Sequence, residues 1–300
     1  MITTTLRQSA PAAVPLVGTA EPTILVVDLG GSWSRFAVGG EPIDEELIAK
    51  HQTLPGYEDT VAQVGRAAAF LCEKKPDAIG FGIAGQMTDG TLTEGGKLKQ
   101  FGWVGRPIAS DIAAALNLDP SRVVGLNDVA AAAKAEQVAT NRQGNTDTQA
   151  IYTLSTGFGG ALFTPRSIIP DEPGHEYLRA GAQCACGRDG CLEAHVSGLG
   201  IAAKYGLGDA PLPPDDPRWS RVKGDLVAGV YSMLDRYAED GHNPRRLSFF
   251  GSVALKGPDI LGCLRDGLMG LRDDAPQVDT ATYGDVSGLQ GAYFAARETL

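Results

Sequence analysis

A short pattern that occurs twice in this chain limits what it can fold into: an apolar run, a glycine-rich turn and a returning apolar run. The first copy spans 24–38, with Gly30, Gly31 and Ser32 at its turn. The second copy spans 151–163, with its turn at 155–160. Apolar runs of this length on both sides of a glycine turn predict β-hairpins. One hairpin in each half of the chain hints at an old duplication.

Strand and helix patterns alternate along the rest of the chain, which predicts an α/β fold. Further strands are predicted at 78–84, 123–126 and 247–250, and helices at about 57–74, 108–116, 129–138, 225–237 and 288–298. The glycine-rich polar segment that runs to Lys99 and the Pro- and Asp-rich segment 206–220 are predicted to be loops.

The glycines of the strand at 78–84 match a dinucleotide-binding motif, but its structural context is missing. Gly80, Gly82 and Gly85 have the spacing G-x-G-x-x-G, which holds a pyrophosphate where a helix begins directly after the glycines. The following residues, QMTDGT, are a poor helix start, so we reject this interpretation. The P-loop motif G-x-x-x-x-G-K-[ST] does not occur either.

Both glycine turns have the composition of phosphate-binding loops. Glycines let backbone N–H groups approach a phosphate, and Ser32 adds a hydroxyl donor. Asp28, at the end of the first strand, could hold Mg²⁺ directly or through water. An ordinary hairpin with a surface aspartate explains the first turn alone equally well. Two such turns in one chain favour a nucleotide held from both sides.

Asn127 and Asp128 lie between a short strand and an alanine-rich helix. Aspartate is a favoured helix N-cap, and the spacing alone favours that role for Asp128. The alternative is functional, because ligands of α/β proteins collect at the C-terminal ends of strands. There, Asp128 could accept the proton of a substrate hydroxyl during phosphoryl transfer.

The most specific local signal is a cluster of one histidine and three cysteines: His175, Cys184, Cys186 and Cys191. Three thiolates and an imidazole complete a tetrahedral zinc set, and four protein ligands indicate a structural site. The alternatives are buried free thiols or a disulfide, which would leave one thiol over. Glu172 and Glu193 flank this cluster, where rigidly held carboxylates could accept hydrogen bonds from sugar hydroxyls; each is otherwise an ordinary surface residue.

The chain as a whole excludes several partners. A formal net charge of −10 argues against nonspecific binding to nucleic acid or to an anionic membrane. No apolar run approaches the length of a membrane span. Residues 1–21 are expected to be a flexible leader without the features of an export signal. Because three of the five cysteines lie within eight positions and no export signal precedes them, we expect a cytoplasmic protein.

Taken in order, these motifs resemble the ROK family of sugar kinases (repressors, open reading frames, kinases). The matching segments are 28–32 (DLGGS, for D-x-G-G-T), 126–130 (LNDVA, the catalytic N-D segment), 155–160 (STGFGG, the second phosphate loop), 172–175 and 184–193 (EPGH and CACGRDGCLE, for E-x-G-H and C-x-C-G-x-x-G-C-x-E), 250–254 (FGSVA, the adenosine side) and 287–292 (SGLQGA, the closing helix). The resemblance covers about residues 22–300.

The resemblance implies a two-domain, actin-like (ribonuclease-H-like) ATPase fold with a cleft that closes on sugar and ATP. It implies a small N-terminal domain at 22–128, on which a closing helix at 287–300 packs, and a larger C-terminal domain at 129–286 that carries the zinc loop. It also implies ATP, Mg²⁺ and a structural Zn²⁺ as cofactors, and a homodimer or homotetramer as the assembly.

The resemblance further assigns roles to residues, with Asp128 as the catalytic base. The implied sugar ligands are Gly85, Asn127, Asp128, Glu172, His175 and Glu193, and His175 would also bind zinc with Cys184, Cys186 and Cys191. The implied nucleotide ligands are Asp28, Gly30, Gly31, Ser32, Thr156, Gly157, Gly159, Gly160, Gly251 and Ser252.

Departures from the family pattern leave the sugar open. Ser32 stands for threonine, and Lys99 to Phe101 stand before Gly102 where family kinases often carry a sugar-binding asparagine. Glucose is the default hexose, phosphorylated at O6, with mannose, N-acetylmannosamine and kanosamine as alternatives. A family repressor needs a basic DNA-binding domain of about 70–80 residues, whereas 27 nearly uncharged residues precede Asp28, so we expect a kinase. A sugar-binding regulator without catalysis is the remaining alternative.

Overall fold

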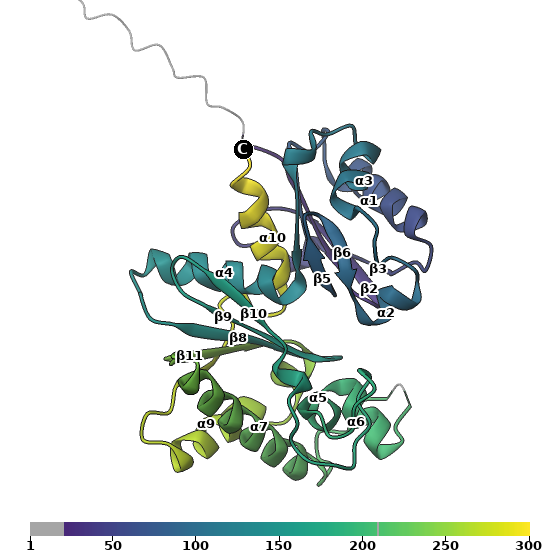
Figure 1. Ribbon diagram of the computed structural model, residues 1–300. Helices are drawn as coiled ribbons and strands as arrows, with labels where there is room; N and C mark the ends of the chain where they lie inside the picture. Colours follow the sequence, from purple (N-terminus) through teal and green to yellow (C-terminus); the bar gives the residue numbers. More distant parts are fainter. Residues whose placement is uncertain (1–20, 209) are drawn as a thin grey trace, which may run out of the picture.

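Two five-stranded sheets with the same plan form the framework of the protein (Figure 1). The computed structural model describes residues 21–208 and 210–300, so the leader expected at 1–21 lies outside the described residues except for Glu21. Helices and strands from both halves of the chain make up this mixed α/β fold. No helix among the described residues is long and apolar enough to span a membrane.

The first sheet has the order β3-β2-β1-β4-β7. Its strands are β1 (Ile24–Leu29), β2 (Trp33–Val38), β3 (Ala49–Gln52), β4 (Ala78–Ile83) and β7 (Val123–Asn127). The first three strands pair antiparallel, whereas β4 and β7 run parallel to β1. Helices α1 (Tyr57–Leu71) and α3 (Ile108–Ala115) pack against one face through a buried apolar cluster, and α10 (Ser287–Arg297) packs against the other.

The second sheet repeats this plan with the order β10-β9-β8-β11-β12. Its strands are β8 (Gln149–Leu154), β9 (Phe158–Phe163), β10 (Ile168–Asp171), β11 (Arg246–Phe250) and β12 (Gln277–Thr280). Again three strands pair antiparallel and two parallel. The shared strand order and directions fit the duplication that the repeated hairpin pattern suggested.

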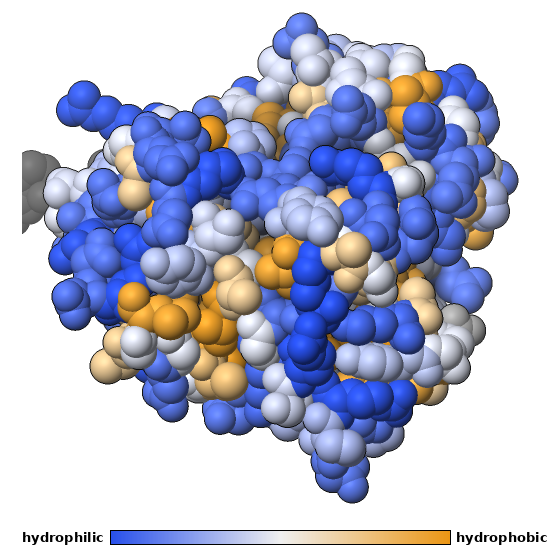
Figure 2. All heavy atoms as spheres, turned by 60° about the horizontal axis from the view of Figure 1, so that its bottom comes forward, coloured by the Kyte–Doolittle hydropathy of each residue, from blue (hydrophilic) through white to orange (hydrophobic). Residues whose placement is uncertain are grey.

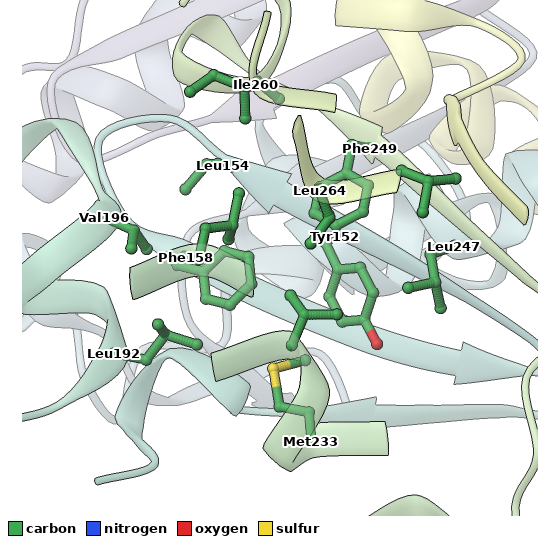
Figure 3. Packing of buried hydrophobic residues seen from close by; sticks show 14 of the residues in the cluster. Tyr152, Leu154, Phe158, Leu192, Val196, Met233, Leu247, Phe249, Ile260 and Leu264 are labelled. Carbon is green, nitrogen blue, oxygen red and sulfur yellow. The ribbon is translucent and has the colours of Figure 1, made fainter. Parts of the chain in front are cut away.

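The larger apolar core lies below the second sheet, where α5 (Leu192–Val196), α7 (Trp219–Glu239) and α9 (Ile260–Leu271) cover it (Figures 1 and 3). The rings of Tyr152 and Phe249 lie 5.1 Å apart there, and Met233 of α7 fills the space beneath them. Burial of each such side chain stabilises the fold by about 1.5–3 kcal/mol. Helix α4 (Asp128–Arg142) covers the opposite face with Val129 and small alanines.

Small residues let α10 lie tightly between the first sheet and α4. A Cβ atom at Gly80 would overlap the Ala292 carbonyl oxygen, and one at Gly291 would overlap that of Ala131. Gly80 and Gly82 are strand residues of β4, which agrees with rejecting the dinucleotide motif. The closing helix therefore packs on the first sheet. The boundary between two domains at 128/129 stays a prediction, and it coincides with the junction of β7 and α4.

Several elements differ from the sequence prediction. The segment predicted to be a loop before Lys99 contains the hairpin β5 (Gln86–Thr88) and β6 (Thr91–Glu94) and the short helix α2 (Gly96–Gln100). The reason is the Asp89-Gly90 turn, in which both residues have positive φ, as a tight hairpin turn requires. Helix α7 also begins at Trp219, inside the predicted loop. Helices α6 (Gly198–Tyr205) and α8 (Ser252–Lys256), like β3, β10, β12 and α9, were not predicted.

Candidate active site

The first glycine turn is held in place by a residue that the sequence did not single out. Gly30 N–H donates to the Trp33 carbonyl at 3.1 Å, and a Cβ atom at Gly30 would lie 2.6 Å from that oxygen. Thr53, directly after β3, donates its hydroxyl to the Gly30 carbonyl at 2.6 Å and its N–H to the Ser32 carbonyl at 3.0 Å. The two hydrogen bonds from Thr53 therefore hold the turn that carries Gly31 and Ser32 in place.

Asp28 lies at the end of β1, directly opposite Arg35 of β2. The guanidinium donates to Asp28 Oδ2 through Nη2 at 2.7 Å and Nε at 2.8 Å, and its Nη1 donates to the Asp285 carbonyl at 2.8 Å. Both contacts to Asp28 use the same carboxylate oxygen. Asp28 is thus oriented at the mouth of the first turn, where the sequence predicts it to hold a magnesium ion.

Asn127, and not Asp128, is the N-cap of α4, which corrects the sequence prediction. Asn127 Oδ1 accepts hydrogen bonds from the N–H groups of Val129 and Ala130. These N–H groups lie in the first turn of α4 and have no carbonyl partner within the helix, and the side chain that reaches both of them is that of Asn127, the residue before Asp128. Its amide also donates to the Gly85 carbonyl at 3.1 Å. Asp128 is the first residue of the helix. Asn127 caps the helix, so Asp128 is not required for capping.

Asp128 lies among other carboxylates. Burial, reinforced by the negative charges of Asp28 and Glu172, raises the pKa of the Asp128 carboxyl to about 7. Its Oδ1 accepts the Val129 N–H at 2.9 Å, which opposes part of that shift. Gly82 of β4 lies next to Asp128, because a Cβ atom at Gly82 would be in van der Waals contact with the Asp128 backbone at 3.6 Å. A carboxyl that titrates near neutral pH is suited to proton transfer.

Glu172 connects this carboxylate group to the other half of the chain. It follows β10, and its Oε1 accepts from Gln86 Nε2 of β5 at 2.7 Å. Its carbonyl accepts the His175 N–H at 3.0 Å within a short 3₁₀ turn. The structure thus brings Gly85, Asn127, Asp128 and Glu172 together, and Gln86 joins them without having been predicted.

Glu193 joins the cysteine-rich loop to the second glycine turn. Its Oε2 accepts the Phe158 N–H at 2.8 Å, and its Oε1 lies 3.8 Å from Cys184 Sγ. A side chain at Gly157 would press on this carboxylate, since a Cβ atom there would lie 2.8 Å from Oε2. One oxygen of the Glu193 carboxylate therefore stabilises the second glycine turn. The other oxygen faces the His–Cys cluster, next to which sugar contacts are predicted.

The predicted nucleotide residues of the second half lie in two places. Thr156 and Gly157 are at the turn between β8 and β9, and Gly251 and Ser252 follow β11, the neighbour of β8. Gly251 has a φ of 99°, and a Cβ atom there would lie 2.8 Å from the Leu154 carbonyl, so the two segments touch.

Gly159 and Gly160 belong to strand β9, which begins at Phe158 directly after the turn. A Cβ atom at Gly160 would press on the Tyr152 ring and on Pro173, and one at Gly159 would press on Val129. These two glycines serve close packing, and a nucleotide contact from them stays a prediction.

The side chains of the predicted zinc set meet at one point. The ligand atoms of His175, Cys184, Cys186 and Cys191 all lie within 4.8 Å of one another. Cys184 Sγ lies 3.7 Å from His175 Nδ1, and Cys186 Sγ lies 3.6 Å from Cys191 Sγ. A tetrahedron with metal–sulfur bonds of about 2.3 Å has edges of about 3.7 Å. The four side chains therefore fit a zinc ion.

The three thiols differ in how readily they ionise. Burial raises the pKa of Cys184 to about 12. Burial also opposes ionisation of Cys186, yet hydrogen bonds from Arg188 outweigh it and lower the Cys186 pKa to about 6. A divalent cation allows all three thiols to ionise, so binding would release protons.

A clamp that the sequence did not reveal fixes both ends of the 172–175 segment. Arg236 of α7 donates through Nη2 to Asp171 at 2.7 Å and through Nε to Glu176 at 2.6 Å. The Tyr237 hydroxyl also donates to Asp171. Desolvation raises the pKa of Glu176, and the pairing with Arg236 opposes that shift. One arginine thereby positions the backbone that carries Glu172 and His175.

Comparison with known proteins is consistent with this arrangement. A family model described as "ROK family" matches residues 24–228. An N-acetylmannosamine kinase from Shigella boydii is 31% identical over 240 residues, which is 71% of this chain and 80% of that protein. A ROK family glucokinase from Streptomyces griseus, solved with glucose and AMPPNP, has a TM-score of 0.73 at 24% identity and covers 92% of this chain and 99% of its own. A ROK hexokinase from Thermus thermophilus has a TM-score of 0.66 at 23% identity, with the same coverage.

Proposed function

The chain belongs to the ROK family, and on that premise we propose that it is an ATP-dependent hexose kinase that transfers the γ-phosphoryl group to the sugar O6 hydroxyl. The observation that carries this proposal is Asp128, a carboxyl at the end of β7 whose pKa is raised to about 7 among Asp28 and Glu172. An aspartate in that state near neutral pH accepts a proton readily once it is ionised.

The proton transfer can be assigned to one atom. Asp128 Oδ1 is engaged by the Val129 N–H, so Oδ2 receives the proton of the sugar hydroxyl. The hydroxyl oxygen bonds to the γ-phosphorus while the bond from that phosphorus to the bridging oxygen breaks, and ADP leaves. Asp128 then gives the proton to solvent. Positioning of both substrates supplies most of the remaining rate enhancement.

The sugar is proposed to lie between the residues that join the two halves. Asn127, Glu172, His175 and Glu193 offer hydrogen bonds from both sides, together with the backbone of Gly85. Nδ1 of His175 faces Cys184, which leaves Nε2 for a sugar hydroxyl. The contacts of Arg236 with Asp171 and Glu176 would hold Glu172 and His175 in position relative to Asp128.

The nucleotide is proposed to span the two glycine turns. Gly30, Gly31 and Ser32 would hold its reactive end, while Thr156, Gly157, Gly251 and Ser252 would hold its other end. A magnesium ion bound near Asp28 would neutralise charge on the phosphates. A zinc ion held by His175 and the three cysteines would stabilise the loop that carries Glu193, without taking part in the chemistry.

A second candidate substrate has specific support. The relative from Shigella boydii, at 31% identity, is an N-acetylmannosamine kinase, whereas the glucokinase of similar fold is only 24% identical. N-acetylmannosamine is therefore a strong alternative to glucose, ahead of mannose and kanosamine.

The test is ADP release by the purified protein with Mg·ATP and glucose, mannose, fructose, N-acetylmannosamine, N-acetylglucosamine or kanosamine. We expect one sugar to raise the rate well above the sugar-free rate. Calorimetry with the same sugars separates the remaining alternative, since sugar binding without ADP release indicates a non-catalytic regulator.

A further inference from the structure

A lysine outside every predicted motif lies over the tip of the first glycine turn. Lys97 belongs to α2, the short helix after the β5–β6 hairpin, and α2 lies near β2 at the lower end of the upper lobe (Figure 1). Lys97 Nζ lies 3.3 Å from Ser32 Oγ. A Cβ atom at Gly31 would lie 3.1 Å from Lys97 Cβ, so α2 packs closely against the turn at Gly31.

The Lys97 side chain is held there without a charged partner. Its Nζ lies 5.8 Å from the centre of the ring of Phe101, the residue directly after α2. Among the described residues no carboxylate forms an ion pair with Lys97, and its ammonium retains donors beyond the one directed at Ser32. The side chain is exposed, so an incoming ligand can reach it.

The side chains near the turn are mostly negatively charged, so a cation there would be stabilising when a nucleotide binds. Asp28, Asp128 and Glu172 are close enough to influence one another, and a nucleotide triphosphate would add further negative charge. The other cation at the turn, Arg35, already binds Asp28 and the Asp285 carbonyl. Lys97 lies at Ser32 and remains available to a phosphate.

We propose that Lys97 is a catalytic residue that contacts the terminal phosphate of the nucleotide, the group that is transferred, when that phosphate lies on the first glycine turn. This inference rests on the proposed kinase function. The terminal phosphate is the relevant one because the first turn lies beside Asp128, whereas Gly157 and Gly251 lie in the other half of the chain. The ammonium stabilises negative charge on the phosphoryl oxygens as the bond to ADP breaks.

The test compares Lys97→Met, which keeps the length of the stem and removes the charge, with Lys74→Met as the control. Lys74 is an exposed lysine just before β4, at the ends of the strands that lie away from the first glycine turn. Isothermal titration of the full chain with Mg·AMPPNP and with Mg·ADP gives a readout that needs no sugar. For Lys97→Met we expect the affinity for AMPPNP to fall about 10- to 100-fold and the affinity for ADP to change little.

Turnover with the sugar of the panel that the wild type phosphorylates adds a second readout. We expect kcat to fall about 10- to 100-fold in Lys97→Met, partial recovery in Lys97→Arg, and wild-type values in Lys74→Met. An AMPPNP affinity and a kcat equal to wild type in Lys97→Met would overturn the inference, as would equal losses for AMPPNP and ADP. A wild-type protein that binds AMPPNP but phosphorylates no sugar would instead count against the proposed function, and the titration would still decide the role of Lys97.

Discussion

At the scale of single residues, the protonation of Asp128 determines the pH range of the proposed reaction. Only the carboxylate form accepts a proton, and the Asp128 pKa is raised to about 7. We expect kcat/KM for the sugar to fall as the pH falls, with a midpoint at or somewhat below about 7, because a cation bound at Asp28 would lower the Asp128 pKa. Initial rates between pH 5 and pH 9 check this, with the melting temperature at each pH as the control for unfolding. A profile that is flat, or that rises towards acid pH, would contradict the role of Asp128.

The sequence predicted the site residues that lie within short motifs and missed those that act through distant contacts. Asp28, Asn127 and Asp128 lie at the C-terminal ends of predicted strands, and the His–Cys cluster has a recognisable spacing. Arg236, by contrast, is 65 positions from Asp171, and Gln86 is 86 positions from Glu172. A single sequence carries no signal for such pairs, because they exist only once the elements have packed.

At the scale of elements, helix α7 positions the segment 172–175, where sugar ligands are proposed, through Arg236. Arg236→Ala removes the arginine contacts of Asp171 and Glu176, which bracket Glu172 and His175, and leaves Asp171 with the Tyr237 hydroxyl. We expect KM for the sugar to rise about tenfold or more, since misplaced ligands lose most of their binding energy. Steady-state kinetics measure this.

Two further variants keep that prediction specific. Arg236→Lys retains one cation and is expected to give an intermediate KM. Arg221→Ala, on the exposed side of the same helix, breaks only an ion pair with Asp225 and is expected to leave KM unchanged. A wild-type KM in a folded Arg236→Ala protein would show that the clamp does not position the sugar ligands.

The cysteine-rich loop makes a separate prediction about metal content. Cys184→Ser removes one of four side chains whose ligand atoms lie within 4.8 Å of one another, and we expect the purified variant to contain no zinc. Loss of a structural metal is expected to lower the melting temperature by roughly 5–10 °C. Elemental analysis and calorimetry measure both effects, with Cys263→Ser, outside the cluster, as the matched control. One zinc per chain in Cys184→Ser, or none in the wild type, would refute a four-ligand zinc site.

The elements that the sequence predicted are those with strong local patterns, and the others depend on neighbours. The hairpins at 24–38 and 151–163 carry long apolar runs around glycines, and both form as predicted. The edge strands β3, β10 and β12 are only four residues long and partly exposed, so their hydrogen-bonding partners define them. The hairpin at 86–94 was missed because the Asp89-Gly90 turn signal lay in a segment too polar to read as strands.

At the scale of the whole molecule, the two sheets place the two glycine turns in different halves of the chain. The Gln86–Glu172 hydrogen bond joins the halves next to Asp128, so relative movement of the halves would change the carboxylate group directly. Figure 2 shows one face of the molecule, which is mainly hydrophilic with smaller apolar areas between the polar side chains. Assembly into a homodimer or homotetramer stays a prediction that sedimentation would test.

This chain is proposed to transfer the γ-phosphoryl group of ATP to a hexose, with Asp128 as the base. The reaction is followed by ³¹P NMR with Mg·ATP and each hexose of the panel. It is run with the wild type and with Asp128→Asn, after the two proteins have been shown to melt at the same temperature. We predict a sugar 6-phosphate signal with the wild type for one hexose, and a rate lower by about 10²- to 10⁴-fold with Asp128→Asn. No sugar phosphate from any hexose, or equal rates for the two proteins, would contradict the claim.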